Sequence, residues 1–275
     1  MNCAWKELLS ILPPRIRGDT DRIGRETCQE LRLREGAPPE LVLGNKLHFL
    51  NGSVTREELD FVVNTASRYS PWAAASMSKG YLTAPGGHRI GLCGTAIINN
   101  GAMTGIRCLR SVCIRVARDF EGISKPMGRI NGSVLIVGAP GWGKTTLLRD
   151  LIRSVSEDWH VAVVDERGEL FPRGFKTGPL TDILSGCPKS IGIEMMLRTM
   201  GPAYIAVDEI TAPEDCAALL EAANCGVNLL ATVHGASMQD LKQRPLYRTL
   251  LENHIFQTCV IMFKDKTWRM ERIKL

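Results

Sequence analysis

Apolar and polar positions alternate in two different ways along this chain, and the change comes near residue 120. In the first part, residues 29–34 and 111–117 alternate with a period of two, which is typical of strands that bury one face. The other elements predicted there are a helix from 56 to about Tyr69, behind a capping box of Thr55 and Glu58, and a hairpin at 81–98. We therefore expect residues 1–120 to form a small α+β domain.

The second part consists of short, continuous apolar runs separated by helical stretches. The strands predicted from these runs are 134–137, 160–164, 204–207 and 228–233, followed by a closing hairpin of 255–263 with 268–273. Strands that alternate with helices predict a parallel sheet covered by helices. We therefore expect an α/β, RecA-like P-loop NTPase core over residues 133–275. Residues 121–132, with glycines, a proline and mixed charges, are interpreted as a linker.

The most specific motif lies where the second part begins. Residues 133–146 read SVLIVGAPGWGKTT, and the spacing of Gly138, Gly143, Lys144 and Thr145 fits the phosphate-binding loop, or Walker A pattern. Glycines let the backbone N–H groups turn toward phosphate oxygens, and the next helix adds its positive N-terminal end. The candidate nucleotide-binding residues are Gly138, Ala139, Pro140, Gly141, Trp142, Gly143, Lys144, Thr145 and Thr146.

ATP and Mg²⁺ are the cofactors that this loop predicts. Lys144 would place its charge on the β- and γ-phosphates, and the Thr145 hydroxyl would be a ligand of the metal. The strand at 204–207 runs into Asp208 and Glu209, which has the shape of a Walker B motif. Asp208 would be the second Mg²⁺ contact, and Glu209 would orient the water that attacks the γ-phosphate. The alternative is that both residues only open the next helix, but Thr211 and Glu214 form a second capping box there.

Two further strands end in candidate site residues. His234 follows the strand at 228–233, and Glu166 follows the strand at 160–164. Because ligands bind outside the carboxyl ends of the strands in open α/β sheets, we expect Lys144, Glu166, Glu209 and His234 to converge in one catalytic site. His234 would sense the γ-phosphate, or it is a structural histidine. Glu166 would contact Mg²⁺ or water, or it pairs with Arg167.

Charge is distributed unevenly between the two parts. Residues 1–120 hold 16 Lys and Arg against 11 Asp and Glu, and this difference of 5 equals the net charge of the whole chain. The basic part fits an anionic membrane surface, an acidic partner or a neighbour's nucleotide, as well as an ordinary solvated face. It also contains most candidates for the cation that stabilises the transition state from a neighbouring subunit. These candidates are Arg89, Arg110, Arg115, Arg118 and, from the second part, Arg198.

Taken together, the motifs resemble a known family. Walker A, the acidic VVDERGEL, the Walker B sequence VDEI and the ATVHG box are similar to those of type II and type IV secretion ATPases. With ELRLREGAP, GYLTAPGGHRIGLCG, SVCIRVAR, GKTTLLRDLIR and TDILSGCPKS, they resemble the stage III sporulation AA family over nearly the whole chain. The resemblance implies an ATPase of a secretion-like channel, a hexameric ring, and membrane-embedded channel components as partners. Trp142 departs from the pattern, because small or polar residues are commoner inside this loop.

The function predicted is therefore a Mg²⁺-dependent ATP-hydrolysing motor of a sporulation secretion-like channel. Two alternatives stay open: a RecA-like nucleic-acid translocase, and an ATP-switched scaffold that hydrolyses too slowly to do work. The aromatic content of 6% and the modest charge of +5 argue against a nucleic-acid partner. No apolar run approaches the ~20 residues of a membrane span, and the N-terminus lacks a signal-peptide pattern. We expect a cytoplasmic protein, peripheral at a membrane face through a protein partner.

Overall fold

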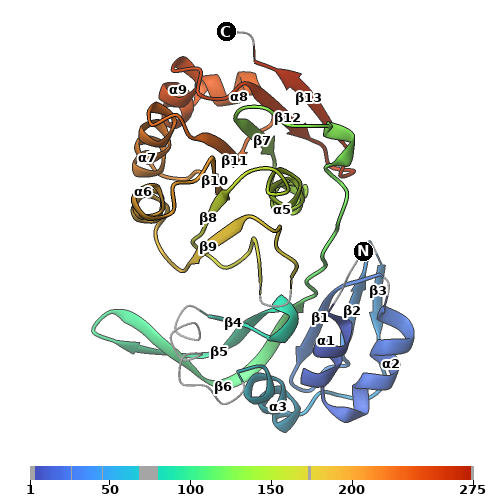
Figure 1. Cartoon of the computed structure of the whole chain (residues 1–275). Coiled ribbons are helices and arrows are strands. Elements are labelled where there is room, and N and C mark those ends of the chain that lie inside the picture. Colours follow the sequence, from blue (N-terminus) through green and yellow to red (C-terminus); the bar gives the residue numbers. More distant parts are fainter. Residues whose placement is uncertain (1–3, 26, 45, 68–79, 173–174, 274–275) are drawn as a thin grey trace. The chain divides into compact units, whose positions relative to one another are not determined.

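The computed structural model describes residues 4–25, 27–44, 46–67, 80–172 and 175–273 (Figure 1). The chain divides into two compact units. The N-terminal unit comprises Met1–Asp119 with Arg173–Phe175, and the C-terminal unit comprises Phe120–Pro172 with Lys176–Leu275. Among the described residues, no helix is both long enough and apolar enough to cross a bilayer.

The N-terminal unit is built on a six-stranded antiparallel sheet in the order β3-β2-β1-β6-β5-β4. Its helices are α1 (Trp5–Ile11), α2 (Pro14–Gly24) and α3 (Arg56–Ser67), with the 3-10 helix η1 (Pro85–Gly87). Its strands are β1 (Cys28–Arg34), β2 (Glu40–Leu43), β3 (Lys46–Phe49), β4 (Tyr81–Thr83), β5 (Arg89–Asn99) and β6 (Ala102–Arg115). Helix α2 packs on β2, and α3 packs on β4 and β6, so one apolar core joins the helices to the sheet.

Local signals in the first part are confirmed in detail. Thr55 N donates to a Glu58 carboxylate oxygen at 3.1 Å, and Glu58 N donates to the Thr55 hydroxyl at 3.3 Å, so the capping box is present. The predicted end of this helix at Tyr69 lies outside the described residues. The hairpin forms from β4 and β5 around the turn η1. The short strands β2 and β3 were not predicted.

The C-terminal unit contains a seven-stranded sheet in the order β13-β12-β7-β11-β10-β8-β9, parallel except for β13. Its strands are β7 (Val134–Gly138), β8 (Val161–Asp165), β9 (Thr181–Ser185), β10 (Tyr204–Val207), β11 (Asn228–His234), β12 (Thr258–Met262) and β13 (Trp268–Arg272). Its helices are η2 (Lys125–Met127), α5 (Lys144–Val155), α6 (Lys189–Met200), α7 (Pro213–Asn224), α8 (Met238–Gln243) and α9 (Pro245–Glu252). The predicted parallel α/β sheet is thus confirmed.

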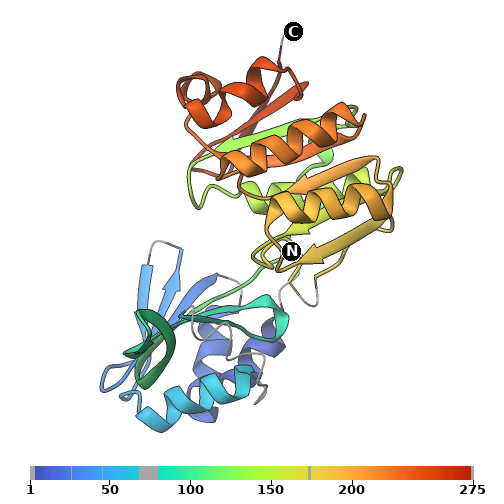
Figure 2. The same ribbon diagram turned by 90° about the vertical axis from the view of Figure 1, so that its left-hand side faces the viewer.

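Each face of this sheet has its own core, because successive strand residues point to opposite faces. In β7, Leu135 and Val137 belong to the core that contains α6, α7 and α9, whereas Val134 and Ile136 belong to the core that contains α5. Figure 2 shows α6 and α7 lying over the same face of the sheet. Burial on both faces explains why β7, β8 and β10 read as continuous apolar runs rather than as alternating ones.

Residues 121–132, interpreted as a linker, make specific contacts inside the C-terminal unit. The Asp150 carboxylate on α5 accepts hydrogen bonds from Gly122 N at 2.8 Å and from Ser124 N at 2.7 Å. Met127 and Ile130 are buried in the same core as α5. These contacts attach the segment to α5.

Candidate functional site

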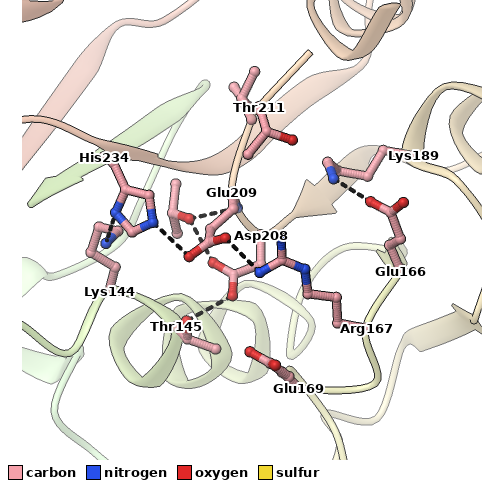
Figure 3. Close-up of polar contacts among 12 residues, drawn as sticks. Lys144, Thr145, Glu166, Arg167, Glu169, Lys189, Asp208, Glu209, Thr211 and His234 are labelled. Carbon is pink, nitrogen blue, oxygen red and sulfur yellow. Dashed lines mark hydrogen bonds and ion pairs between the residues drawn. The ribbon is translucent and has the colours of Figure 1, made fainter. Parts of the chain in front are cut away.

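Four strand tips meet at one edge of the C-terminal sheet. Strands β7, β11, β10 and β8 are neighbours in that order and run parallel, so their carboxyl ends lie side by side. Each tip leads directly into one of the polar segments singled out by the sequence. Figure 3 shows the side chains that these segments bring together.

The phosphate loop connects β7 to α5. Gly141 and Gly143 have φ values of 75° and 100°, in the left-handed region that glycine adopts without strain. A Cβ atom on Gly138 would lie 2.8 Å from the Met262 Cβ, so the loop begins where the backbone has no room for a side chain. Trp142 is half-buried and packs against the α5 side of the core. The Lys266 ammonium donates to the Gly141 carbonyl, a contact that the sequence did not reveal.

A chain of hydrogen bonds joins the phosphate loop to Walker B. The Lys144 ammonium lies 2.9 Å from His234 Nδ1, and His234 Nε2 lies 2.7 Å from Glu209 Oε1. Because an ammonium can only donate, His234 Nδ1 accepts, and Nε2–H donates to the Glu209 carboxylate. Burial lowers the pKa of Lys144, while the charges of Asp208 and Glu209 oppose that shift. His234 therefore connects the loop lysine to Glu209.

Two hydroxyl groups hold the Asp208 carboxylate. Thr145 Oγ1 donates to Oδ2 at 2.7 Å, and Thr232 Oγ1 donates to Oδ1 at 2.5 Å. The Thr232 hydroxyl also accepts from Glu209 N at 2.8 Å, so it orients both acidic residues of Walker B. Thr232 is fully buried, two residues before His234 on the same strand, but nothing in its local sequence context pointed to this role.

Glu209 is restrained on both carboxylate oxygens. His234 contacts Oε1, and Arg167 Nη1 lies 2.9 Å from Oε2. The backbone of Glu209 has a φ of 54°, a left-handed conformation that costs about 1–2 kcal/mol outside glycine. Strained residues of this kind persist only where their surroundings hold them, and they cluster at functional sites. Arg167 was considered from the sequence only as a partner of Glu166, and this pairing is wrong.

The loop that carries Glu166 and Arg167 is held by two buried charged residues. The Asp165 carboxylate accepts hydrogen bonds from the backbone N–H groups of Glu169, Leu170 and Phe171 at 2.9, 2.9 and 3.2 Å. Arg149 on α5 donates to the carbonyls of Glu169 and Leu170. Burial raises the pKa of Asp165, although these N–H groups favour its ionised form. Asp165 is thus a structural anchor that positions Arg167.

Glu166 does not touch the other candidate residues. Its carboxylate pairs with the Lys189 ammonium at the start of α6, and Lys189 also lies 3.6 Å from Asp215. A small hollow lined by Glu166, Lys189, Asp208 and Glu209, among others, connects this pair to the site. Lys189 is only 5% exposed, so the pair satisfies a buried cation. The expected convergence holds for Lys144, Glu209 and His234, whereas Glu166 faces Lys189.

The second capping box was predicted one residue out of register. The Asp215 carboxylate, rather than that of Glu214, accepts hydrogen bonds from Thr211 N at 3.0 Å and Ala212 N at 3.2 Å. Helix α7 therefore has its own cap, and Asp208 and Glu209 are not needed for that purpose.

The oxygens around Asp208 fit a magnesium ion. Thr145 Oγ1 on α5 and an oxygen of Asp208, which follows β10, are hard ligands of the kind that Mg²⁺ prefers. These two oxygens lie 2.7 Å apart. Within the described part of the chain, no group of three His, Cys, Asp or Glu side chains is arranged to hold a metal by itself. Mg²⁺ commonly completes its shell with waters and substrate phosphates, so these two oxygens would supply only part of its coordination.

The buried charge of Asp208 leads to a stability prediction. Burial raises the pKa of Asp208 in the folded protein. The protonated carboxyl therefore stabilises the fold at low pH, and this stabilisation is lost as the pH rises through the folded-state pKa. At neutral pH, well above the unfolded-state pKa, the buried carboxyl therefore costs stability. We expect Asp208→Asn to raise the free energy of unfolding of the nucleotide-free protein by about 1 kcal/mol at neutral pH. Thermal melts would show a gain that disappears in acid, whereas Asp60→Asn, at an exposed position of α3, should change nothing.

The candidate arginines lie in different surroundings. Arg198 forms an exposed pair with Glu194 on α6, and Arg115 lies 3.7 Å from Glu30 in the N-terminal sheet. Arg118 donates to the Cys28 carbonyl at 3.0 Å, and Arg89 stacks on the Tyr81 ring. The guanidinium beside Glu209 belongs to Arg167, which was not among them.

Solved structures of P-loop ATPases share this fold. The pilus retraction motor PilT with bound ADP matches 90% of this chain and 76% of its own, with a TM-score of 0.65 and 16% identity. The ATPase DotB of Legionella pneumophila matches 90% of this chain and 76% of its own, with a TM-score of 0.58 and 20% identity. At such identities the likeness establishes the fold, which is that of the P-loop ATPases.

Sequence comparison identifies the family. The family model described as "Sporulation stage III, protein AA" matches residues 5–272. Stage III sporulation protein AA of Bacillus subtilis is 36% identical over 282 residues, which cover 94% of this chain and 91% of the relative. The same motifs that form the strand-tip site lie within this match. The chain therefore belongs to the stage III sporulation protein AA family.

Proposed function

We propose that this chain is a Mg²⁺-dependent ATPase that works as a motor for a secretion-like channel in sporulation. The observation that supports it most is the hydrogen-bonded path from Lys144 through His234 to Glu209, beside the Thr145–Asp208 pair. A lysine for phosphate, an oxygen pair for metal and a carboxylate for water are the parts that P-loop hydrolysis requires. Family membership and the fold of PilT and DotB support the same reading.

Each residue has a distinct task in this proposal. The backbone of residues 138–146 and the N-terminus of α5 would hold the phosphates of ATP, and Lys144 would bind the terminal phosphates. Thr145 and Asp208 would hold Mg²⁺, which neutralises phosphate charge. Glu209 would orient and polarise the attacking water. His234, which contacts both Lys144 and Glu209, would change its hydrogen bond to Glu209 when Lys144 binds a phosphate. Glu166 would act indirectly, by fixing Lys189 at the rim of the hollow.

Assembly and location are inferred from the family rather than from the site. We propose a homo-oligomeric, hexameric ring in the cytoplasm, attached to membrane-embedded channel components. An ATPase assay combined with size analysis, each with and without nucleotide, tests this. Mg²⁺-dependent phosphate release that EDTA abolishes, together with a nucleotide-dependent shift to a larger species, is expected. A monomer without turnover under all conditions would contradict the motor.

One observation favours a second candidate, the ATP-switched scaffold with very slow hydrolysis. In the structure, both oxygens of the Glu209 carboxylate are engaged, by His234 and by Arg167. The carboxylate must release one of them before it contacts water. Arg167 has an exposed side chain, 57% accessible, so it is the contact that opens more readily.

Replacing Arg167 with alanine separates the two candidates. If Arg167 restrains an active Glu209, Arg167→Ala should raise basal phosphate release several-fold, because one carboxylate oxygen is freed at a cost of only about 1 kcal/mol of exposed ion pair. Arg22→Ala, which removes an exposed arginine paired with Asp19 on α2, is the matched control and should leave the rate unchanged. Hydrolysis that stays undetectable in Arg167→Ala would support the scaffold.

A further inference from the structure

The hairpin of β5 and β6 extends past its sheet. Strand β4 pairs with β5 only at residues 89–91, and β1 pairs with β6 only at 111–115. The hairpin continues to the pair Asn99 and Ala102, and Figure 1 shows it projecting beyond the other strands. Residues 94–108, which we call the arm, therefore form a two-stranded ribbon with no third strand among the described residues. Such ribbons are marginally stable in water and offer unpaired edges.

The base of the arm is specifically built. A Cβ on Gly94 would lie 2.7 Å from the Cys108 carbonyl oxygen, so the two strands cross there more closely than any side chain allows. Cys108 has a φ of 47°, and the ladder shifts register between Cys93 and Thr95. A bulge of this kind bends a strand and changes the direction of the residues beyond it. The arm thus leaves the sheet at a defined bend.

The distal part of the arm exposes aliphatic side chains. Ile97, Ile98 and Met103 are 38%, 56% and 36% exposed, and Ile98 lies opposite Met103 in the ladder. Directly opposed residues lie on the same face of a ribbon, so Ile98 and Met103 form one apolar surface. The arm contains one charged residue, Arg107, and no aromatic residue. Exposed apolar surface on such an unsupported ribbon indicates that something covers it.

The stretch of sequence that contains the arm carries charge of one sign, although Glu35, whose N–H donates to the Arg110 carbonyl, lies beside the base of the arm. Residues 61–118 contain seven Lys and Arg but no Asp or Glu, although about six acidic residues would be expected from the chain's 29 in 275. Arg107 and Arg110, at the base of the arm, are exposed, and neither forms an ion pair with a described residue. A protein partner would require only a local patch of positive charge. The arm itself holds no carboxylate, and the exposed guanidinium groups of Arg107 and Arg110, unpaired among the described residues, suit an anionic surface.

We propose that the arm contacts lipid directly: its apolar end enters the interface of a bilayer that carries anionic headgroups, and Arg107 and Arg110 bind the headgroup phosphates. Nucleic acid fits poorly, because the arm has no aromatic ring for base stacking and its aliphatic end has no use on a phosphate backbone. Apolar insertion together with basic residues is the combination that gives stable attachment to anionic membranes. This inference does not depend on nucleotide hydrolysis.

Co-sedimentation of the full chain with vesicles tests it. The vesicles are phosphatidylcholine alone, or phosphatidylcholine mixed with phosphatidylglycerol. The chain should bind only the mixed vesicles, and the double change Ile98→Asp with Met103→Asp should weaken binding at least tenfold. Arg107→Ala and Arg110→Ala should each weaken it about fivefold, as expected for one basic residue near an anionic surface. Ile191→Asp, at a 60% exposed position of α6, is the matched control and should bind like the unchanged chain.

Weaker vesicle binding by the substituted chains can be distinguished from misfolding. All four substituted positions in the arm region are exposed, and circular dichroism melts should match those of the unchanged chain. Failure of the unchanged chain to bind mixed vesicles would overturn the proposal. An acidic protein would then be the expected partner of the arm. Binding that survives Ile98→Asp with Met103→Asp would overturn it as well.

Discussion

Lys144→Ala should reduce the affinity for ATP at least about 100-fold. Lys144 as a whole residue is only 5% exposed, and its ammonium lies 2.9 Å from His234 Nδ1, where a terminal phosphate would replace His234 as its partner. A charge-assisted hydrogen bond contributes about 1.5–3 kcal/mol, and Lys144 would make more than one. Burial lowers the pKa of this ammonium, and the negative charge of a bound phosphate would oppose that shift. The phosphate would thus favour the protonated form of Lys144.

Trp142 provides the readout for this change. It is half-buried inside the phosphate loop, so its fluorescence should respond when Mg²⁺ and ATP are added to the unchanged chain. The response should vanish in Lys144→Ala and persist in Lys242→Ala, which alters an exposed lysine on α8. Undiminished ATP affinity in Lys144→Ala would place the nucleotide outside the loop.

Glu209→Gln should abolish turnover while leaving nucleotide binding intact. The glutamine has the size of Glu209, and its oxygen still accepts from His234 Nε2–H, whereas its NH2 group loses only the contact with the exposed Arg167 guanidinium. It lacks the negative charge that polarises water, and the loss of a general base typically costs about 100- to 10,000-fold in rate. Glu214→Gln changes an exposed glutamate at the start of α7 and is the matched control.

Single-turnover phosphate release, measured beside ATP affinity, separates the two effects. The expected pattern is an unchanged dissociation constant with a rate that falls to the background of hydrolysis in buffer. A Glu209→Gln chain that hydrolyses ATP at the original rate would show that another group activates the water.

The sequence was most informative where one local rule governs the structure. The Walker A spacing predicted both β7 and α5, because the loop geometry and the flanking elements are required together. Apolar runs located β8, β10 and β11 to within a residue, since strands buried on both faces are composed mostly of apolar residues. Strand β9 was missed because it lies at the edge, partly exposed, and carries Thr181 and Asp182.

The site was predicted as a set of strand tips but not as a set of contacts. Parallel strands place their carboxyl ends together, and this general rule brought Lys144, Glu209 and His234 to one place. The pairing of Glu166 with Lys189 spans 23 residues and depends on how α6 packs, which no local pattern encodes. Arg167 and Thr232 were missed for the same reason, because each acquires its role from a neighbour in space.

A structure of this chain with Mg²⁺ and a non-hydrolysable ATP analogue would test the proposed ATPase site most directly. The proposed mechanism predicts the γ-phosphate within about 3 Å of Lys144 Nζ, Mg²⁺ beside Thr145 Oγ1 and Asp208, and a water between Glu209 and the phosphorus. A triphosphate bound away from residues 138–146, or a Glu209 carboxylate turned away from the γ-phosphate, would contradict it.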